Sequence, residues 1–468
     1  MVARSPGRGD DPKVEPNSVV ALNPTGALAE FVATLGWDQL PGRVAERVKE
    51  LILDALASAL LGYDAQEVRP LAAVADSLAP GRGATVIGGG RASPAAAALA
   101  NGYLITAVTI CDIHRPTSCH VMPEVLPAAL ASAEMAGSSG RDLLLAVAAG
   151  AEVTTRIGLA FGNDEFRKRG WHMPGIAGPF GGAAAVGRLL GLDAPRISDA
   201  LGIAGSQATG SYAQLRTPAI KFQQARGALA GLLAGQFASA GLHSAQDVLL
   251  HPDGGVLRTH SEGGLPELAM DGLGERWELE QISLRPWPVA VHLQPLVTSL
   301  LEYSSTTAVP LRDIAEVRVE LSEAAYGMHG RTGYGDRFRA RLSAPYVTGV
   351  VLQDGECGLP QFHPERLHDP ALVTFVEDRV KIVVNPDLLG SSVGVRITNF
   401  AGGARSDRRD TAKGDPETPL SRADVEGKFR RAAIGRLGGD ATERAVDLVA
   451  HLEDVGNAGD LFQCLRAG

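Results

Sequence analysis

Apolar residues recur at helical spacing over the first half of the chain, from about residue 25 to residue 241. In residues 43–61 (RVAERVKELILDALASALL) they form one stripe, and Gly62 follows as a stop signal. Similar patterns predict further helices over residues 71–78, 94–109, 125–136, 140–158, 178–190 and 197–207. Several of these segments carry Ala on nearly every side, which favours helices that pack against other helices.

The pattern changes near Glu278, where β-branched residues begin to alternate in part with polar ones. Strands are predicted over residues 314–321 (IAEVRVEL), 380–384 and 393–399. One helix is predicted before these strands, at residues 295–303, and another between the first two strands, at residues 345–353. This part of the chain is therefore predicted to be an α+β domain.

A charged segment with Gly and Pro, residues 405–419, is predicted to be a mobile hinge loop. Helices are predicted again over residues 422–437 and 441–452. Because their Ala and Leu pattern matches the first half of the chain, we expect them to return to it. The predicted fold is mainly α, a large all-helical domain formed by N- and C-terminal segments, with a smaller α+β second domain.

The resulting organisation has four parts. The first, residues 1–24, is rich in Pro, Gly and charge and lacks the apolar segment of a signal peptide, so it is predicted to be a disordered leader. The others are residues 25–277 (first part of the helical domain), 278–404 (α+β domain) and 405–468 (hinge loop and return helices).

Composition narrows the possible partners and location. The net charge of −9 argues against a general nucleic-acid binder, and we find no uninterrupted apolar run of the roughly 20 residues that a membrane helix needs. The four cysteines are dispersed without a CxxC pair, which favours reduced thiols in a cytoplasmic protein. We find neither a metal-ligand cluster nor a GxGxxG element, so no metal and no nucleotide cofactor are expected.

Several stretches, in order along the chain, are similar to one known family. They are HVMPEVLPAAL at the start of residues 120–153, GWHMPGIAGPFGG at the start of 170–193, ALGIAGSQATG (200–210), RPWP (285–288), SAPYVTGVVLQDGE (343–356) and KGDPETPLS (413–421). Together they resemble the MmgE/PrpD family, which includes 2-methylcitrate dehydratase, cis-aconitate decarboxylase and iminodisuccinate epimerase. Each stretch alone is unspecific, but their order and combination are specific.

The resemblance implies a helical domain with an α+β lid domain, a homodimer, and an active site in the cleft between the domains that uses no metal. It also implies a small carboxylate substrate. The reaction removes a proton from, or returns a proton to, the carbon beside a carboxylate of that substrate. Such chemistry needs a general base, a general acid, and cations that hold carboxylates and stabilise enediolate-like charge. Histidine suits the first two roles, and Lys and Arg suit the last.

Four residues match catalytic positions of the family, namely His120, His172, Lys221 and Tyr326. Each also has a structural explanation. His120 and His172 precede predicted helices, where a histidine can cap or pack; Lys221 can be a solvated charge; and Tyr326 can close the end of a strand. The combination of all four favours the catalytic interpretation.

The loop CDIHRPTSCH departs from the family pattern D-x-D-D-T. Ungapped counting places Ile110 and His114 where the family has Asp and Thr, with Asp112 between them. Either Asp112 serves through a small shift, or the usual acid is lost and His114 is an added catalytic group.

The substrate-binding candidates depart as well. Gln224 stands where the family usually has a His, and Arg226 follows it as a further carboxylate-binding candidate. In the lid, Arg285 replaces a Lys, which keeps the positive charge but gives a poor proton donor near neutral pH. A lid His is replaced by Ala290, and the nearby His292 is its candidate replacement, the alternative being a packed or exposed residue.

Three functions remain open. The first is a lyase, a dehydratase or decarboxylase of a small polycarboxylate. The second is an isomerase or epimerase, which would use two bases on opposite faces of one carbon. The third is a non-catalytic homologue, which the departures at Ile110, Gln224 and Ala290 allow. The sequence does not choose between the first two.

Overall fold

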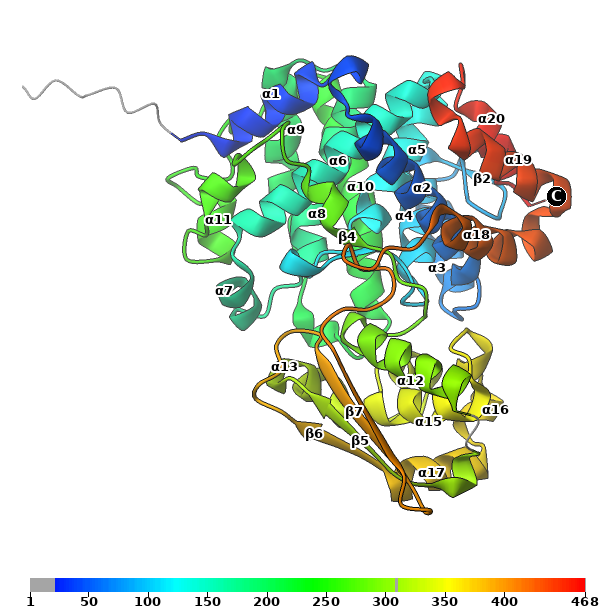
Figure 1. The fold of residues 1–468 in the computed structure, drawn as a ribbon. Helices are drawn as coiled ribbons and strands as arrows, with labels where there is room; N and C mark the ends of the chain where they lie inside the picture. The colour runs from blue at the N-terminus through cyan, green and yellow to red at the C-terminus, as the bar shows by residue number, and fades with distance from the viewer. Residues whose placement is uncertain (1–21, 308–309, 468) are drawn as a thin grey trace, which may run out of the picture.

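The computed structural model describes residues 22–307 and 310–467, and shows a large helical domain above a smaller domain that contains the main sheet (Figure 1). Helices dominate, so the predicted fold class, mainly α with an α+β second domain, is confirmed. Residues 1–21 of the predicted leader, which was predicted over residues 1–24, lie outside the described residues.

The helical domain begins with the helices α1 (Pro24–Thr34), α2 (Gly42–Gly62), α3 (Val68–Leu78), α4 (Pro94–Thr106), α5 (Met122–Ala136), α6 (Gly140–Ala160), α7 (Asn163–Lys168), α8 (Met173–Leu189), α9 (Ala194–Gly205), α10 (Ala219–Ser239) and α11 (Val256–His260). At its centre α8 packs against α5, α6 and α10. A Cβ atom added to Gly231 of α10 would lie 2.6 Å from Cα of Gly182 in α8, so these two backbones meet directly. The small residues seen in the sequence therefore allow close helix contact.

Helix α10 extends well beyond its sequence signal. The pattern near TPAIKFQQARG suggested only a passage from a loop into a helix, yet α10 runs for 21 residues. It is packed between α4, α5, α8 and α9, so apolar and small residues occur on most of its sides. A helix surrounded in this way shows little amphipathic periodicity.

Helix α6 is long and apolar enough by length and composition to cross a membrane, although Glu152 and Arg156 interrupt its apolar run. However, 94% of the relevant window is buried inside the protein. The helix therefore packs as a core helix of the helical domain.

The smaller domain, called the lid domain below, is a sheet covered by helices on one face (Figure 1). Its strands are β5 (Ile314–Leu321), β6 (Val380–Val384), β7 (Val393–Asn399) and β8 (Ala404–Arg409), in the order β6-β5-β7-β8. Strands β5 and β6 are parallel, and the other pairs are antiparallel. The helices are α12 (Gln294–Thr306), α13 (Glu323–Ala325), α14 (Arg337–Ala340), α15 (Ala344–Asp354), α16 (Pro364–Leu367) and α17 (Pro370–Arg379).

Strand β5 explains why the alternation in IAEVRVEL is imperfect. Ile314, Val317, Val319 and Leu321 are buried, and the pairing with β7 shifts between Ile314 and Glu316. A bulge of this kind adds one residue to a strand and turns the following side chains to the other face. The three long predicted strands have the predicted bounds in the structure.

The segment predicted as a hinge loop begins with a strand. Residues 404–409 form β8, which pairs with β7 along six residue pairs, because charged side chains are tolerated on an edge strand. The chain then leaves the lid and forms α18 (Arg422–Leu437), α19 (Gly439–Ala450) and α20 (Gly459–Cys464). As predicted, α18 and α19 return to the helical domain, where they pack against α2 (Figure 1).

Four short strands complete the fold. β1 (Ala84–Thr85) pairs with β2 (Arg91–Ala92), and β3 (Ile113–His114) pairs with β4 (Ile282–Ser283). The second pair joins the loop before α5 to the segment that enters the lid. It therefore holds together two parts of the chain that carry half of the predicted site residues, namely Asp112, His114 and His120 in the first and Arg285 and His292 in the second.

Candidate active site

The pairing of β3 with β4 brings Arg285 against the loop at Cys111. The Arg285 Nε atom donates a hydrogen bond to the Cys111 carbonyl oxygen at 2.5 Å, and its Nη2 lies 3.3 Å from Cys111 Sγ. The guanidinium is almost fully buried. A cation that enters from the lid segment thus lies against the loop of the helical domain that leads to His120.

Asp112 orients this loop rather than standing free in the cleft. Its carboxylate accepts hydrogen bonds from the backbone N–H groups of Val121 (2.8 Å) and Met122 (3.2 Å), at the start of α5. A carboxylate at this position satisfies unpaired N–H groups and interacts favourably with the helix dipole. Burial raises the pKa of Asp112, and Cys111 adds to the shift. Asp112 therefore fixes the start of α5 directly after His120.

The ring of His120 is held by the same residue. Its Nδ1 atom lies 2.7 Å from the Asp112 carbonyl oxygen. A carbonyl only accepts, so Nδ1 carries the hydrogen, and in the neutral ring Nε2 carries the free lone pair. His120 thus presents a proton acceptor whose orientation is fixed.

His172 is oriented in the same way at the start of α8. Its Nδ1 atom lies 2.8 Å from Gln223 Oε1, and Gln223 Nε2 donates to the Ser211 carbonyl oxygen at 2.9 Å. The second bond fixes the orientation of the amide, so Gln223 Oε1 accepts from His172 Nδ1. His172 Nε2 is then a second available acceptor.

Lys221 lies in the first turn of α10 and is buried with these histidines. Burial lowers the pKa of Lys221 to about 8, with Arg285 and Arg341 adding to the decrease and Cys111 and Glu124 opposing it. Its ammonium group is therefore mostly charged at pH 7 but gives up a proton far more readily than an exposed lysine.

Electrostatic interactions place both histidines and Lys221 in one site. Burial lowers the pKa of His120 well below its usual range, and Arg285 and Lys221 lower it further. Burial also lowers the pKa of His172 to about 3, with a contribution from His120. Both rings are therefore neutral at physiological pH, and the ammonium group of Lys221 lies close enough to each to affect its pKa.

Glu124 lies beneath this cluster and was missed by the sequence analysis. The side chain is fully buried, and neither carboxylate oxygen has a hydrogen-bond partner among the described residues. A Cβ atom at Gly178 of α8 or Gly227 of α10 would collide with it, so these glycines provide its space. Burial raises the pKa of Glu124 well above its usual range. A buried carboxyl group with a raised pKa thus lies close to Lys221.

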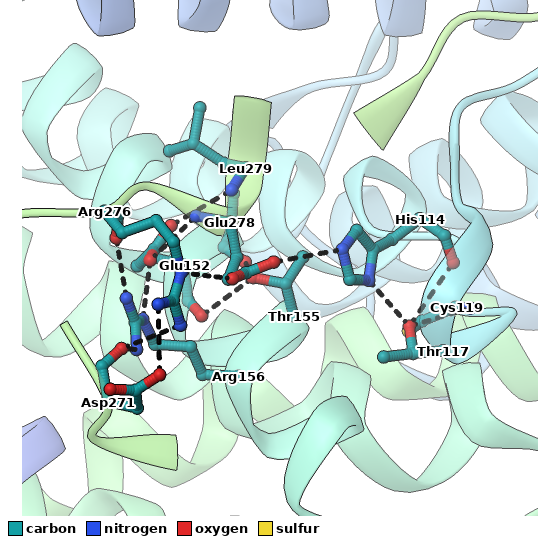
Figure 2. Close-up of polar contacts among 11 residues, drawn as sticks. His114, Thr117, Cys119, Glu152, Thr155, Arg156, Asp271, Arg276, Glu278 and Leu279 are labelled. Carbon is teal, nitrogen blue, oxygen red and sulfur yellow. Dashed lines mark hydrogen bonds and ion pairs between the residues drawn. The ribbon is translucent and has the colours of Figure 1, made fainter. Parts of the chain in front are cut away.

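His114, a candidate acid, lies between Thr117 and Glu278 in the helical domain (Figure 2). It is fully buried, with Nδ1 2.9 Å from Thr117 Oγ1 and Nε2 3.7 Å from Glu278 Oε2. Burial lowers the pKa of His114. His114 therefore packs within the loop and contacts Thr117 and Glu278. It is not one of the groups around Lys221.

Figure 2 also shows why the segment before β4 is so well fixed. Glu152 and Arg156 of α6 form a fully buried ion pair at 2.6 Å. Glu152 accepts hydrogen bonds from the backbone N–H groups of Glu278 and Leu279, and Arg156 donates to the carbonyl oxygen of Arg276. The pair anchors the chain just before it reaches β4 and Arg285.

The remaining candidates lie in different surroundings. Arg226 donates to three backbone carbonyls, those of Gly175, Gln207 and Thr209, so three of its five N–H donors are used within the helical domain. Tyr326 accepts a hydrogen bond from Arg331 at the half-exposed start of a π-helical turn.

Gln224 is buried on α10 one turn after Lys221, and its Oε1 has no hydrogen-bond partner among the described residues. This position suits the substrate-binding role predicted for Gln224. His292 is half-buried in the lid beside a second histidine, His329.

A cavity of about 440 Å³ lies between the two domains. Its walls include Thr217 and Pro218, which directly precede α10, and Arg341 from the lid. Its lining does not include His120, His172 or Lys221, but it reaches the two residues before α10, the helix that carries Lys221. The basic residues Arg216 and Arg341 in its lining favour an anionic ligand.

Asp64, in the wall of this cavity, links the two domains. It follows α2 in the helical domain and forms ion pairs with three lid residues, Arg337, Arg341 (3.0 Å) and His363 (3.3 Å). One carboxylate therefore ties three lid side chains to the helical domain, and an anionic substrate would meet Arg341 at this contact.

Sequence reasoning missed Cys111, Glu124, His329 and Arg341. Glu124 had a usable signal, because a charged residue inside the apolar segment MPEVLPAAL is rarely buried without a function. Arg341 and His329 lie in irregular parts of the lid, where no periodic pattern marks the buried positions.

The described residues contain no group of three or more His, Cys, Asp or Glu side chains that could hold a metal ion. What the cluster does offer is two neutral imidazoles, one ammonium group with a lowered pKa, and the guanidinium groups of Arg285 and Arg341.

Two family models match the chain in succession. The MmgE/PrpD N-terminal domain matches residues 26–269, and the MmgE/PrpD C-terminal domain matches residues 287–454. Similar curated proteins include the cis-aconitate decarboxylase of Aspergillus terreus, 31% identical over 72% of this chain and 73% of the relative.

Two further relatives cover the chain almost completely. The cis-aconitate decarboxylase-like protein oryM of Aspergillus oryzae is 28% identical over 94% of this chain and 96% of its own length. The cis-aconitate decarboxylase of Homo sapiens is 28% identical over 94% of both chains. The matched domains span both parts of the fold, and the chain therefore belongs to the MmgE/PrpD family.

Proposed function

We propose that this protein is a lyase that removes carbon dioxide or water from a small polycarboxylate. The observation that carries the proposal is the cluster at Lys221, a buried ammonium group with a pKa of about 8 beside two neutral histidines whose Nε2 atoms are free to accept. The family and the names of the relatives, cis-aconitate decarboxylases, support carboxylate chemistry.

Charge determines how a substrate would lie. Arg341 borders the cavity, and Arg285 lies behind Cys111 on the lid side, so carboxylates of the substrate would face these two cations and Lys221. Arg grips a carboxylate through parallel hydrogen bonds. The same positive charges stabilise the enediolate-like anion that forms when a bond beside the carboxylate breaks.

In decarboxylation, the bond between a substrate carbon and one carboxylate breaks and carbon dioxide leaves. The electron pair stays on the substrate, conjugated with a second carboxylate, and one proton then returns to carbon. Lys221 is the suited donor, because both histidines are neutral at pH 7 and Arg285 holds its protons too tightly.

In dehydration, His120 or His172 would take a proton from carbon through Nε2, and Lys221 would protonate the departing hydroxyl. The same two free acceptors also favour a second candidate function, epimerisation, because a two-base mechanism needs neutral acceptors near one carbon. Only the fate of the substrate separates the lyase from the epimerase.

The proposal is tested by incubating the protein in deuterated water with cis-aconitate and with related hydroxylated di- and tricarboxylates. We expect loss of carbon dioxide with deuterium incorporated at carbon, or loss of water, each seen by mass spectrometry. For dehydration, His120→Gln is expected to lower the rate about 100-fold, as for loss of a general base. His451→Gln, at an exposed histidine, is expected to leave the rate of either reaction unchanged. Deuterium exchange without loss of either group would identify an epimerase, and no reaction at all would contradict both functions.

The pH dependence of kcat/KM is a second prediction. Lys221 acts in its protonated form, so activity is expected to decrease as pH rises through about 8. On the acid side, His172 with a pKa of about 3 stays neutral, so activity is expected to remain level from about pH 7 down to about pH 5. A rate profile between about pH 4 and pH 10 checks this. An acid limb near the ordinary histidine pKa of about 6.5 would contradict the neutral-histidine assignment.

A further inference from the structure

The lid carries a pair of histidines that the cluster at Lys221 does not include. His329 is buried, with Nδ1 2.9 Å from the Leu342 carbonyl oxygen and Nε2 3.2 Å from His292 Nδ1. The two ring centroids are 5.3 Å apart. His329 belongs to the π-helical turn Tyr326–Gly330, a rare geometry that occurs frequently at functional sites.

The hydrogen bonds determine where the protons are. The Leu342 carbonyl only accepts, so His329 Nδ1 is protonated and, in the neutral ring, His329 Nε2 accepts. His292 Nδ1 must then donate to His329, which leaves the lone pair of His292 on Nε2. No hydrogen bond to His292 Nε2 is present within residues 22–307 and 310–467. The half-buried His292 thus ends the chain of hydrogen bonds as a free proton acceptor.

The pair lies where the lid meets the catalytic half of the helical domain. Arg216 donates to the carbonyl oxygens of Gly327 (2.9 Å) and Met328 (3.3 Å), and Tyr212 Oη lies 3.6 Å from Met328 Sδ. The Tyr212 ring in turn packs edge-on against His172, 5.9 Å between centroids. The π-helical turn is therefore separated from His172 by a single aromatic ring.

The chain segment of His292 also leads directly to the site. The backbone N–H of Ala290 donates to the Arg341 carbonyl oxygen at 3.1 Å, and Arg285 Nη1 donates to the Val289 carbonyl oxygen at 3.3 Å. His292 thus follows a segment that contacts both lid cations expected to face the substrate carboxylates. Burial lowers the pKa of His292 to about 4 and that of His329 to about 3, with His292 and Arg216 adding to the second shift.

We propose that His292 is a second proton acceptor, contributed by the lid, and that His329 is its positioning residue. The inference rests on the proposed function and deepens it. A C–H bond beside a substrate carboxylate breaks, the proton moves to His292 Nε2, and the electron pair remains on the substrate as an enediolate held by the cationic groups. Because His292 Nδ1 keeps its hydrogen bond to His329, the imidazolium is stabilised without any rearrangement.

One consequence is that the proton-transfer groups come from both domains. His120 and His172 approach the substrate from the helical domain, and His292 approaches from the lid. Proton removal on the lid side would then require a closed lid, which Asp64 holds through Arg337 and Arg341.

The test replaces His329 by Phe and by Gln. Phe keeps a ring but removes both hydrogen bonds, whereas Gln can donate to Leu342 and accept from His292. With a substrate that wild type turns over, we expect His329→Phe to lower kcat about 50-fold with KM little changed, and His329→Gln to restore kcat to within about 5-fold of wild type. Equal losses in both variants, or none in either, would overturn the positioning role. His292→Ala with full turnover would overturn the role of His292.

A second measurement needs no substrate. In protein labelled with ¹⁵N-histidine, NMR shifts report which ring nitrogen carries the proton, and the His292 signal is identified by its absence in His292→Ala. We expect His292 to be protonated at Nδ1 in wild type and in His329→Gln, and to become mixed in His329→Phe. A wild-type His292 protonated at Nε2 would overturn the inference. If no candidate acid is turned over, the lyase proposal fails while this result still stands on its own.

Discussion

Lys221→Met is expected to lower kcat about 1,000-fold while the protein stays folded, because loss of a single charge-stabilising donor costs about 10²–10³ in kcat and loss of a general acid about 10²–10⁴. The variant removes an ammonium group that is buried with two neutral histidines and the lid cations. Methionine has a similar length and no charge, so burial at this position does not become less favourable. Steady-state kinetics measure the effect, on the substrate that the incubation in deuterated water identifies. A thermal melt of each variant shows whether it is folded.

Lys221→Arg is the matched control. Arginine keeps the positive charge that holds a carboxylate but does not release a proton near neutral pH. We therefore expect KM to stay near the wild-type value while kcat remains at least about 100-fold reduced, and the decrease in rate near pH 8 to disappear. Full activity in Lys221→Arg would show that this residue binds substrate without donating a proton.

Local patterns predicted much of the fold because the relevant elements are amphipathic. Helix α2 shows an apolar stripe at its start, although every residue from Leu51 to Leu60 is buried, and strand β5 has a buried set broken only by its bulge. Both have bounds close to the predicted ones. Helix α10 and strand β8 were missed for opposite reasons. Helix α10 is surrounded by other helices, and β8 is a charged edge strand that its pairing with β7 stabilises.

The candidate site was predictable where a residue type and a helix start coincide. His120, His172 and Lys221 each lie at or just before the start of a helix, and the structure brings these three together. The roles of Asp112 and His114 could not be predicted from the sequence. The role of Asp112 depends on the direction of the backbone at the start of α5, and that of His114 depends on a contact with a residue distant in sequence. One side chain caps α5, and the other points toward Glu278, 164 positions further along the chain (278 minus 114).

The lid pair shows the same limit. His292 and His329 are 37 residues apart in sequence, and only the π-helical turn places their rings in contact. A sequence pattern identifies which side chains could exchange protons. The hydrogen-bond partners that determine their tautomers come from tertiary structure.

The return helix α18 reaches the active site through one buried lysine. Lys428 Nζ donates to Asp54 Oδ1 at 2.6 Å, to the Ile110 carbonyl oxygen at 3.0 Å and to the Arg285 carbonyl oxygen at 3.1 Å. It therefore joins α2, the loop before Cys111 and the segment that enters the lid. Burial raises the pKa of Asp54, which Lys428 opposes, so the carboxylate depends on this partner for its charge.

Lys428→Met is expected to lower the free energy of unfolding by about 3–5 kcal/mol, because it leaves Asp54 buried without its partner. The value of kcat is expected to decrease as well, since the backbones of Ile110 and Arg285 lose their common donor and the Arg285 guanidinium shifts from Cys111. Thermal and denaturant unfolding measure the first effect. Lys413→Met, which breaks an exposed ion pair with Asp424, is the control and is expected to cost less than about 1 kcal/mol.

The double variant Asp54→Asn, Lys428→Met separates the two effects. With the buried carboxylate also removed, most of the lost stability is expected to return, because a neutral pair carries no unpaired charge. Activity is expected to stay low, since neither of the two introduced side chains supplies a donor to both Ile110 and Arg285. If stability and kcat recover together, Lys428 acts on the site only through the stability of the fold, and the link from α18 to Arg285 is wrong.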